Sequence, residues 1–368
     1  MATLAACGGG HSGAQGDAVH LGFIVDKTGS LAPIGIGYNK GVQIAVSEWN
    51  ADAKHPQIDL TTCDSQSTGD GAIACYQKLR GSVDAISGPS LFVGLAAVRS
   101  VAASGTVPLV SGAPLVDPPA GSPLFQTIPT IADGVAAGFA YFQKHHMSKV
   151  GILTSNDEPG NQAKAGASKY ASKYGINLVS KEVFDPSAQN LAAQAENIAG
   201  SHPDAVLAWT AGPQLITALR ALATAGVKVP IMLNYASMST ALLTKAGAGA
   251  TSNTYFFASR AFDPATIRDK GWQARVKDFD KRFRAKFNTA PDLTAFDSAD
   301  TVFAVGEAAK NGTSSDSIRK GLESGRPLPA FLFSQYKYTA QNHVGLSGAN
   351  AFDILKYHPQ QKIWRLVH

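Results

Sequence analysis

The chain has 368 residues, of which 45% are hydrophobic and 16% are charged, and its formal net charge is +5. This length favours two domains over one hydrophobic core, and the composition is that of a folded protein and excludes a disordered chain. Lysine and arginine are spread along the sequence and no nucleic-acid-binding motif accompanies them, so we expect no nucleic-acid partner.

The first residues, 1–17, suggest a lipid anchor followed by a tether. Leu4-Ala5-Ala6-Cys7 matches the bacterial lipobox, in which the cysteine is lipidated, although an Ala-rich stretch before a cysteine can also arise by chance. The Gly-rich segment 8–16 suits a flexible tether. No run of eighteen or more apolar residues is present, so we expect an extracytoplasmic protein that touches the membrane only through Cys7.

Residues 20–50 are predicted to form a buried strand, a loop and a long helix. The run HLGFIVD is apolar enough for a strand that is covered on both faces. The loop TGSLAPIGIG can offer backbone N–H groups to a ligand, because glycines permit close approach, and it makes Ser30 a candidate contact. A core-facing stripe at helical spacing follows, formed by Val42, Ala45, Val46 and Trp49.

Two further cysteines form an even pair if Cys7 is lipidated. Cys63 ends a predicted strand, 58–64, and Cys75 lies in the helical segment that follows. Such positions can bring two Cα atoms within about 7 Å. We predict a disulfide between them, the alternative being two separate buried thiols. No histidine or cysteine lies nearby at the spacing of a zinc site, so we expect no metal.

Short apolar runs alternate with helical segments along the middle of the chain. This order predicts parallel sheets with helices on both faces, and the number of strands favours two sheets. The alternation ends near Asp263, where helical patterns at 268–288, 293–311 and 314–324 follow. The strand-like runs are 58–64, 84–89, 107–112, 149–155, 176–184, 204–210, 229–235 and 254–259, with 332–340, 349–358 and 362–368 in the tail.

Candidate ligand contacts follow the predicted strands. Gly88-Pro89-Ser90 ends a strand and begins a helix, where free N–H groups and the helix dipole favour an anion, or where Ser90 simply caps the helix. Because parallel strands end at one edge of a sheet, the loops there should line a ligand crevice. The candidates are Ser90, Leu91, Phe92, Ser111, Gly112, Ala113, Glu158, Trp209, Thr210, Asn234, Tyr235, Phe296 and Asp297.

Several segments, taken in order, resemble one family. The helix that ends in Glu48-Trp49-Asn50, the Gly-Pro-Ser turn with its following helix and strand, and the run LFQTIPTIADG are three of them. The fourth is AFDSADTVFAVGEAAKNG, which carries an aromatic-Asp motif. Together they resemble the branched-chain amino-acid receptors, which are type I periplasmic solute-binding proteins of ABC importers.

The resemblance implies an α/β fold of two doubly wound lobes with parallel sheets, joined by a three-crossover hinge. Lobe one would comprise 18–132 plus 263–334, and lobe two 133–262 plus 335–368. The implied function is that of a monomeric receptor whose lobes close on a small molecule. Its Gly-Pro-Ser turn would bind a carboxylate of that molecule, and the receptor would dock on an ABC transporter permease.

The chain departs from amino-acid receptors in its candidate cleft. Leu91-Phe92 and Ala113-Pro114-Leu115 stand where those receptors commonly have hydroxyl side chains, and Asn234-Tyr235 stand where they often have a carboxylate. Glu158 or Asp297 could replace that carboxylate. Phe92, Trp209, Tyr235 and Phe296 favour a flat or apolar solute, although we expect at least one of them to be core packing only. A hydrophobic or aromatic acid is therefore expected ahead of a branched-chain amino acid.

Two other functions remain open from the sequence. One is a ligand sensor of the same fold that reports to a signalling system. The other, which the motifs disfavour, is an α/β enzyme of hydrolase or dehydrogenase type. No Gly-x-Ser-x-Gly elbow and no phosphate-loop lysine motif occurs, and Gly8, Gly10 and Gly13 precede the first strand and so fail the context of a dinucleotide site. We expect no catalysis and no cofactor.

Overall fold

A computed structural model describes residues 18–113, 118–119 and 121–367. Cys7, the tether, Pro114 and Leu115 therefore lie outside the described residues. The first sheet has five strands in the order β2-β1-β3-β4-β5, and all its pairings are parallel. Its strands are β1 (Val19–Val25), β2 (Ile58–Asp64), β3 (Ala85–Ser87), β4 (Leu109–Ser111) and β5 (Leu124–Gln126).

The second sheet has seven strands in the order β14-β13-β10-β9-β8-β6-β7. The strands β6 to β10 pair in parallel, whereas β13 pairs antiparallel with both β10 and β14. The bounds are β6 (Lys149–Ser155), β7 (Asn177–Phe184), β8 (Ala205–Trp209), β9 (Ile231–Asn234), β10 (Thr254–Ala258), β13 (Asp353–His358) and β14 (Ile363–Val367).

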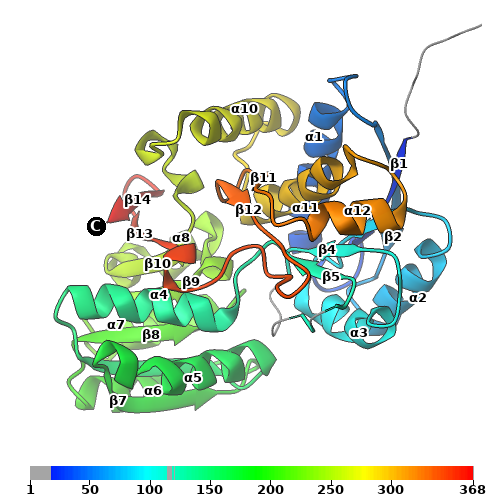
Figure 1. Cartoon of the computed structure of the whole chain (residues 1–368). Coiled ribbons are helices and arrows are strands. Elements are labelled where there is room, and N and C mark those ends of the chain that lie inside the picture. Colours follow the sequence, from blue (N-terminus) through cyan, green and yellow to red (C-terminus); the bar gives the residue numbers. More distant parts are fainter. Residues whose placement is uncertain (1–17, 114–117, 120, 368) are drawn as a thin grey trace, which may run out of the picture.

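Helices separate the strands in both halves, as Figure 1 shows. The described helices are α1 (Ala32–Trp49), α2 (Gly69–Leu79), α3 (Phe92–Ala102), α4 (Ile131–Lys144), α5 (Glu158–Tyr170), α6 (Ala192–Gly200), α7 (Gln214–Thr224), α8 (Thr240–Ala246), α9 (Ala248–Thr251), α10 (Lys270–Phe287), α11 (Leu293–Ala309) and α12 (Ser315–Leu322). Short 3-10 turns are η1 (Ser172–Tyr174), η2 (Tyr235–Ser237), η3 (Arg260–Phe262), η4 (Pro264–Thr266) and η5 (Ala349–Ala351). The α/β fold with parallel sheets is thus confirmed.

The chain passes between the two halves three times (Figure 1). The first passage leads from β5 to α4, and the second leads from β10 to α10. The third follows the small hairpin of β11 (Leu328–Pro329) and β12 (Gln335–Tyr336) and leads to β13. The helix α11, which comes after the second passage, packs against α1 and therefore lies with the first half. Three crossovers therefore join the two sheets.

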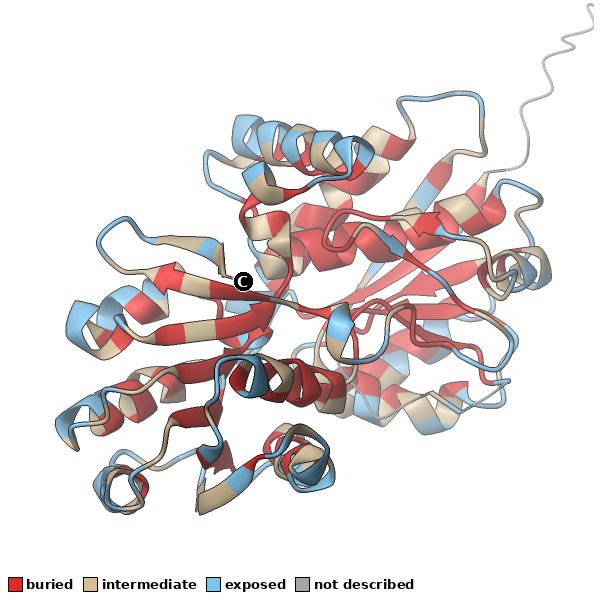
Figure 2. Ribbon diagram, turned by 60° about the vertical axis from the view of Figure 1, so that its left-hand side comes forward, coloured by how far each residue is buried: buried red, intermediate tan, exposed pale blue. Residues whose placement is uncertain are grey.

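Local sequence accounts for where the helices begin and which faces they bury. Thr130 and Asp133 form a capping box at α4, and the carboxylate of Asp269 accepts the N–H of Trp272 at α10. The stripe predicted on α1 faces the core, with Val42, Ala45 and Trp49 buried. Figure 2 shows the same pattern throughout, with buried strands inside and exposed helix faces outside.

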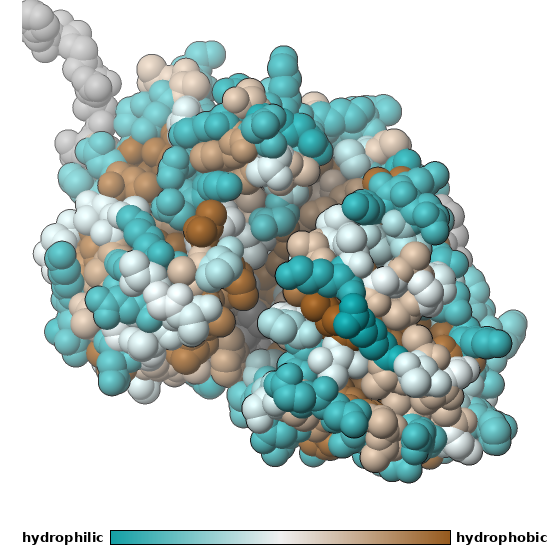
Figure 3. Space-filling view, turned by 180° about the vertical axis from the view of Figure 1, so that it is seen from behind, coloured by the Kyte–Doolittle hydropathy of each residue, from teal (hydrophilic) through white to brown (hydrophobic). Residues whose placement is uncertain are grey.

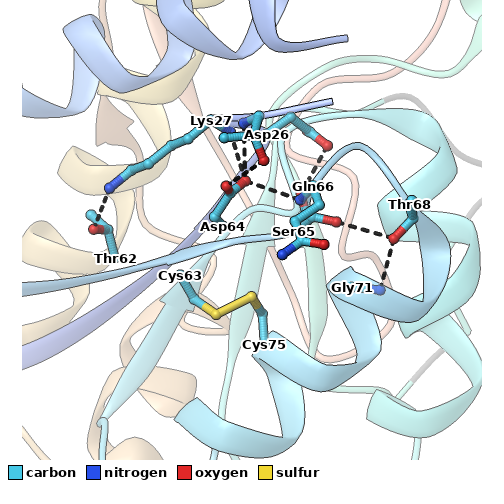
Figure 4. Close-up of a disulfide and its surroundings, with 11 residues drawn as sticks. Asp26, Lys27, Thr62, Cys63, Asp64, Ser65, Gln66, Thr68, Gly71 and Cys75 are labelled. Atoms are coloured by element: carbon cyan, nitrogen blue, oxygen red, sulfur yellow. Dashed lines mark hydrogen bonds between the residues drawn. A yellow bond between two sulfur atoms is a disulfide. The ribbon is translucent and has the colours of Figure 1, made fainter. Parts of the chain in front are cut away.

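The predicted disulfide is present between Cys63, at the end of β2, and Cys75, on α2. The two Cα atoms lie 5.6 Å apart, and the bond closes a sequence separation of 12 residues. Figure 4 shows that it lies next to the loop that follows β2. The bond therefore ties α2 to the edge strand β2 of the first sheet and closes the loop between them. None of the described helices has the length and hydropathy that a membrane span requires.

Candidate functional site

The strand ends of the first sheet are held together by the carboxylate of Asp26, which follows β1. Its Oδ1 accepts the hydroxyl of Ser65 and its Oδ2 accepts the hydroxyl of Ser90, each at 2.8 Å. Ser90 therefore does not cap the helix with its side chain, and the alternative of a simple cap is wrong. The helix α3 begins at Phe92, and Leu91, at the cap position, makes no side-chain hydrogen bond. Among the described residues, the N–H groups of Ser90, Leu91 and Phe92 have no acceptor.

The second loop of this edge, after β4, is also internally bonded. The hydroxyl of Ser111 donates to the carbonyl of Pro89 at 2.8 Å and accepts the N–H of Ala113 at 3.1 Å. The N–H of Ala113 is thus already paired, which contradicts its predicted availability for a ligand. Gly112 lies so close to Asp297 that a Cβ atom added there would be 1.5 Å from Oδ2. Only glycine fits at this contact.

The first loop, after β1, is fastened by Asp64. Its Oδ1 accepts the backbone N–H of Lys27 at 2.9 Å and of Thr28 at 3.2 Å, and its Oδ2 accepts the hydroxyl of Thr28 at 2.7 Å. Asp64 directly follows the disulfide-bonded Cys63 (Figure 4). Ser30 lies in this loop with its side chain exposed.

The second sheet contributes buried side chains at the ends of β8 and β9. Trp209 is only 5% exposed and stacks on Phe257 with ring centroids 5.7 Å apart. Asn234 donates its side-chain amide to the carbonyl of Thr210 at 2.8 Å, so that it links the two strand ends. Tyr235 follows in η2 and is buried. Glu158 in contrast is exposed and accepts a bond from Gln162 on its own helix, which points away from a role as the missing carboxylate.

A polar cluster forms where the two halves meet. Asp297 on α11 is fully buried, and its Oδ1 accepts the hydroxyl of Thr127 from the first crossover at 2.7 Å. Burial raises the pKa of Asp297 to about 7, against the opposing effect of the hydroxyls of Thr127 and Tyr38. Burial, and then the nearby Asp297 carboxyl, raise the pKa of both Tyr38 and Tyr235 far above the usual range. Both phenols therefore stay neutral and able to donate.

Phe296, the neighbour of Asp297, packs mainly against other aromatic rings. Its ring lies 5.0 Å from that of Phe279 and 5.8 Å, edge-on, from that of Phe262. The ring also borders a groove of about 720 Å³ that runs between α1 and α10 on one side and α8 and β14 on the other. Figure 3 shows the molecule hollowed between its two parts, with hydrophobic atoms in the recess. Phe296 thus has the contacts of a core residue.

Three residues of this region were not singled out from the sequence. Asp26 organises the loops of the first sheet, Tyr38 lies beside Asp297, and Phe352 stacks on Tyr235 with centroids 5.6 Å apart. Asp26 directly follows the buried strand β1, and Tyr38 falls on the core stripe of α1, one turn before Val42. These two positions in the sequence could have indicated that Asp26 and Tyr38 belong to the site. Among the described residues, no group of three or more histidine, cysteine or acidic side chains is placed to hold a metal ion.

A parallel sheet and a mostly parallel sheet, joined by three crossovers and with strand ends and buried polar groups at their junction, define a two-lobed ligand receptor. The chain belongs to the periplasmic binding protein family, whose model matches residues 18–356. Members of this family are extracytoplasmic ligand receptors and not enzymes. The comparison with curated proteins gave no match.

Solved structures share the fold over nearly the whole chain. An extracellular ligand-binding receptor from Rhodopseudomonas palustris HaA2 is 19% identical with a TM-score of 0.82, covering 96% of this chain and 100% of that one. LivJ from Streptococcus pneumoniae, solved with isoleucine, is 24% identical with a TM-score of 0.79 and coverages of 95% and 99%. A solute-binding protein from Rhodopseudomonas palustris BisB5, solved with 3,4-dihydroxybenzoic acid, is 19% identical with a TM-score of 0.77 and coverages of 96% and 96%.

Proposed function

We propose that this chain is the solute receptor of an ABC importer and that it captures a small hydrophobic or aromatic carboxylate, or a branched-chain amino acid, between two lobes. Lobe one comprises 18–132 plus 263–334, and lobe two 133–262 plus 335–368. The receptor is a monomer anchored outside the cytoplasmic membrane through lipidated Cys7, and it delivers its ligand to the permease.

The observation that carries this proposal is the start of α3. The N–H groups of Ser90, Leu91 and Phe92 lack acceptors among the described residues, and the three residues lie at the N-terminus of an eleven-residue helix. Such a terminus favours a carboxylate, because its N–H groups and the helix dipole both present positive charge. The hydroxyls of Ser90 and Ser111 are bonded within lobe one, so backbone groups remain for the ligand.

Lobe two supplies the apolar part of the cleft in this proposal. Trp209 and Tyr235 follow neighbouring strands, and their rings are held by Phe257 and Phe352. The named neighbours support such a ligand, since isoleucine and 3,4-dihydroxybenzoic acid both combine a carboxylate with an apolar body. Ligand binding favours the closed form, because the ligand contacts both lobes only there.

A thermal-shift screen tests the proposal. The panel holds aromatic acids, branched-chain amino acids, keto acids and aliphatic acids, with glucose and the matching amides as controls. A ligand at a hundredfold excess over its dissociation constant stabilises the folded state by about 2.7 kcal/mol, which corresponds to a shift of several degrees. Stabilisation by an acid but not by its amide supports the proposal, and a response to sugars alone contradicts it. Uptake of the labelled acid that depends on this protein then separates an importer subunit from a sensor.

A further inference from the structure

Three side-chain atoms at the junction of the lobes are buried and have no hydrogen-bond partner among the described residues. They are Oδ2 of Asp297, the hydroxyl of Tyr235 and the hydroxyl of Thr210. The residues are 0%, 3% and 2% exposed. A buried polar group without a partner is unfavourable, and an unpaired carboxylate oxygen is especially so. The three atoms therefore indicate a group that is absent from the protein itself.

The three atoms come from both lobes and belong to one region. Asp297 is fixed from lobe one, since its other oxygen accepts Thr127 and its carboxyl lies against Gly112. Tyr235 comes from lobe two, and it lies near enough to Asp297 for the carboxyl to influence its titration. Thr210 is joined to the same strand end, because its carbonyl accepts the side chains of Asn234 and Ser237. The free oxygen of Asp297 is thus held rigidly at the junction.

The chemistry of these groups selects the missing partner. An ionised carboxylate only accepts hydrogen bonds, whereas the tyrosine and threonine hydroxyls both donate and accept. Burial raises the pKa of Asp297 to about 7, and a ligand donor that reaches this carboxyl would pair with its ionised form and favour that form over the protonated one. The hydroxyl of Tyr38 lies close enough to influence the pKa of this carboxyl, yet Oδ2 has no hydrogen-bond partner among the described residues and can accept a donor. A hydroxyl or an ammonium group supplies such a donor, and a hydrocarbon group does not.

We propose that Asp297 is a specificity-determining residue that accepts a hydrogen bond from a hydroxyl or ammonium group of the ligand, with Tyr235 as the second contact. This inference rests on the proposed function, and it narrows the ligand to a carboxylic acid that also carries a donor. Hydroxy-aromatic acids and amino acids belong to this class, whereas plain aromatic and aliphatic acids do not. A site built around a donor rejects the analogue that lacks it, because a buried acceptor is then left unpaired.

Two ligand pairs test the inference by calorimetry. One pair is 4-hydroxybenzoate and benzoate, and the other is leucine and 4-methylpentanoate. In at least one pair, the wild type should bind the donor-bearing acid tenfold or more tightly than the acid that lacks the donor. This follows because a hydrogen bond to a charged group typically strengthens binding roughly ten- to a hundredfold. The pair that responds also tells a hydroxyl donor from an ammonium donor.

Variants show whether Asp297 causes this preference. Asp297→Asn should reduce the preference about tenfold and leave the affinity for the plain acid nearly unchanged. Tyr235→Phe, which removes a single oxygen, should also reduce the preference for the donor-bearing acid. It is the variant to measure if Asp297→Asn does not fold. Asp300→Asn is the matched control, because Asp300 is also buried on α11 but accepts the N–H of Phe331 in the hairpin of β11 and β12. This control should leave the preference intact.

The outcomes separate this inference from the receptor proposal. If no acid of either pair binds the wild type, the proposed ligand class fails. If plain acids bind as tightly as donor-bearing ones, Asp297 is not a specificity residue, although the receptor role stands. If Asp297→Asn weakens both members of a pair equally, or if both Asp297→Asn and Tyr235→Phe keep the wild-type preference, the inference is overturned.

Discussion

Replacing Gly112 with alanine should destabilise the protein, because a methyl group has no room there. The added Cβ would lie 1.5 Å from Oδ2 and 2.1 Å from Cγ of Asp297. Asp297 is fully buried and short, and Thr127 holds its other oxygen at 2.7 Å. The carboxyl group therefore cannot swing into solvent, so either its bond to Thr127 breaks or the loop after β4 shifts.

The expected cost follows from these two consequences. Leaving a buried carboxylate without its donor costs about 1–3 kcal/mol. Overpacking a close contact adds about 1–3 kcal/mol. The gain from restricting the unfolded chain on a Gly→Ala change offsets only about 0.4–1 kcal/mol. Gly112→Ala should thus lower the free energy of unfolding by about 1–5.5 kcal/mol in urea denaturation followed by circular dichroism.

Two further variants make this result interpretable. Gly200→Ala is the matched control, because Gly200 ends α6 and no atom lies within 4 Å of its added Cβ. It should leave the free energy of unfolding unchanged or raise it by up to about 1 kcal/mol, because the unfolded chain is restricted without a clash. Combining Gly112→Ala with Asp297→Ala should cost clearly less than the sum of the two single changes. A Gly112→Ala protein as stable as the wild type would refute the packing described here.

Four other predictions concern ligand binding, closure, the disulfide and pH. Trp209→Ala should weaken acid binding roughly ten- to a hundredfold in calorimetry, because burying one ring contributes about 1.5–3 kcal/mol; unchanged affinity would place Trp209 in the core alone. A saturating acid should make the molecule more compact in small-angle scattering, and an apo form that is open and stays open with ligand would contradict closure. Mass spectrometry without reductant should find no alkylatable thiol at Cys63 or Cys75, and replacing both with alanine should cost about 3 kcal/mol, the loop-closure value for a separation of 12 residues. Burial raises the pKa of Asp300 from 3.8 to about 8, so the folded form holds this proton more tightly than the unfolded chain, and the stability it contributes should be lost as the pH rises from about 4 to about 8. In urea denaturation, Asp300→Asn should flatten the pH dependence of the free energy of unfolding over that range, and an unchanged pH dependence would argue against the raised pKa.

Features set by local periodicity could be predicted from the sequence. The helical stripe of α1 and the run of β1 depend on spacing within one segment. Most of the expected residues are buried, although Val46 on α1 is half-buried and His20 on β1 is exposed. The disulfide was also predictable, since a strand end and the next helix lie close in this fold class. In contrast, β5 was missed, because Pro123 and Gln126 bound its two apolar residues, whereas the equally short β3 and β4 lie in longer apolar runs.

The roles of individual site residues depended on partners far away in the sequence. Ser90 matched a helix cap locally, but its hydroxyl bonds Asp26, which lies 64 positions earlier. Phe296 matched a cleft aromatic, but α10 brings Phe279 against its ring. The tail run 332–340 forms only the two residues of β12, because Tyr336 turns inward to bond Asp300. Such choices are made by tertiary packing, which a local pattern does not contain.

The central claim is that an acid binds between the two lobes, and a crystal structure of the protein grown with the acid selected by the thermal screen tests it most directly. The ligand carboxylate should lie within hydrogen-bond distance of the N–H groups of Ser90 to Phe92, and the apolar body should lie beside Trp209 and Tyr235. A ligand held elsewhere, such as in the groove between α10 and β14, or a carboxylate that faces away from the start of α3, would contradict it.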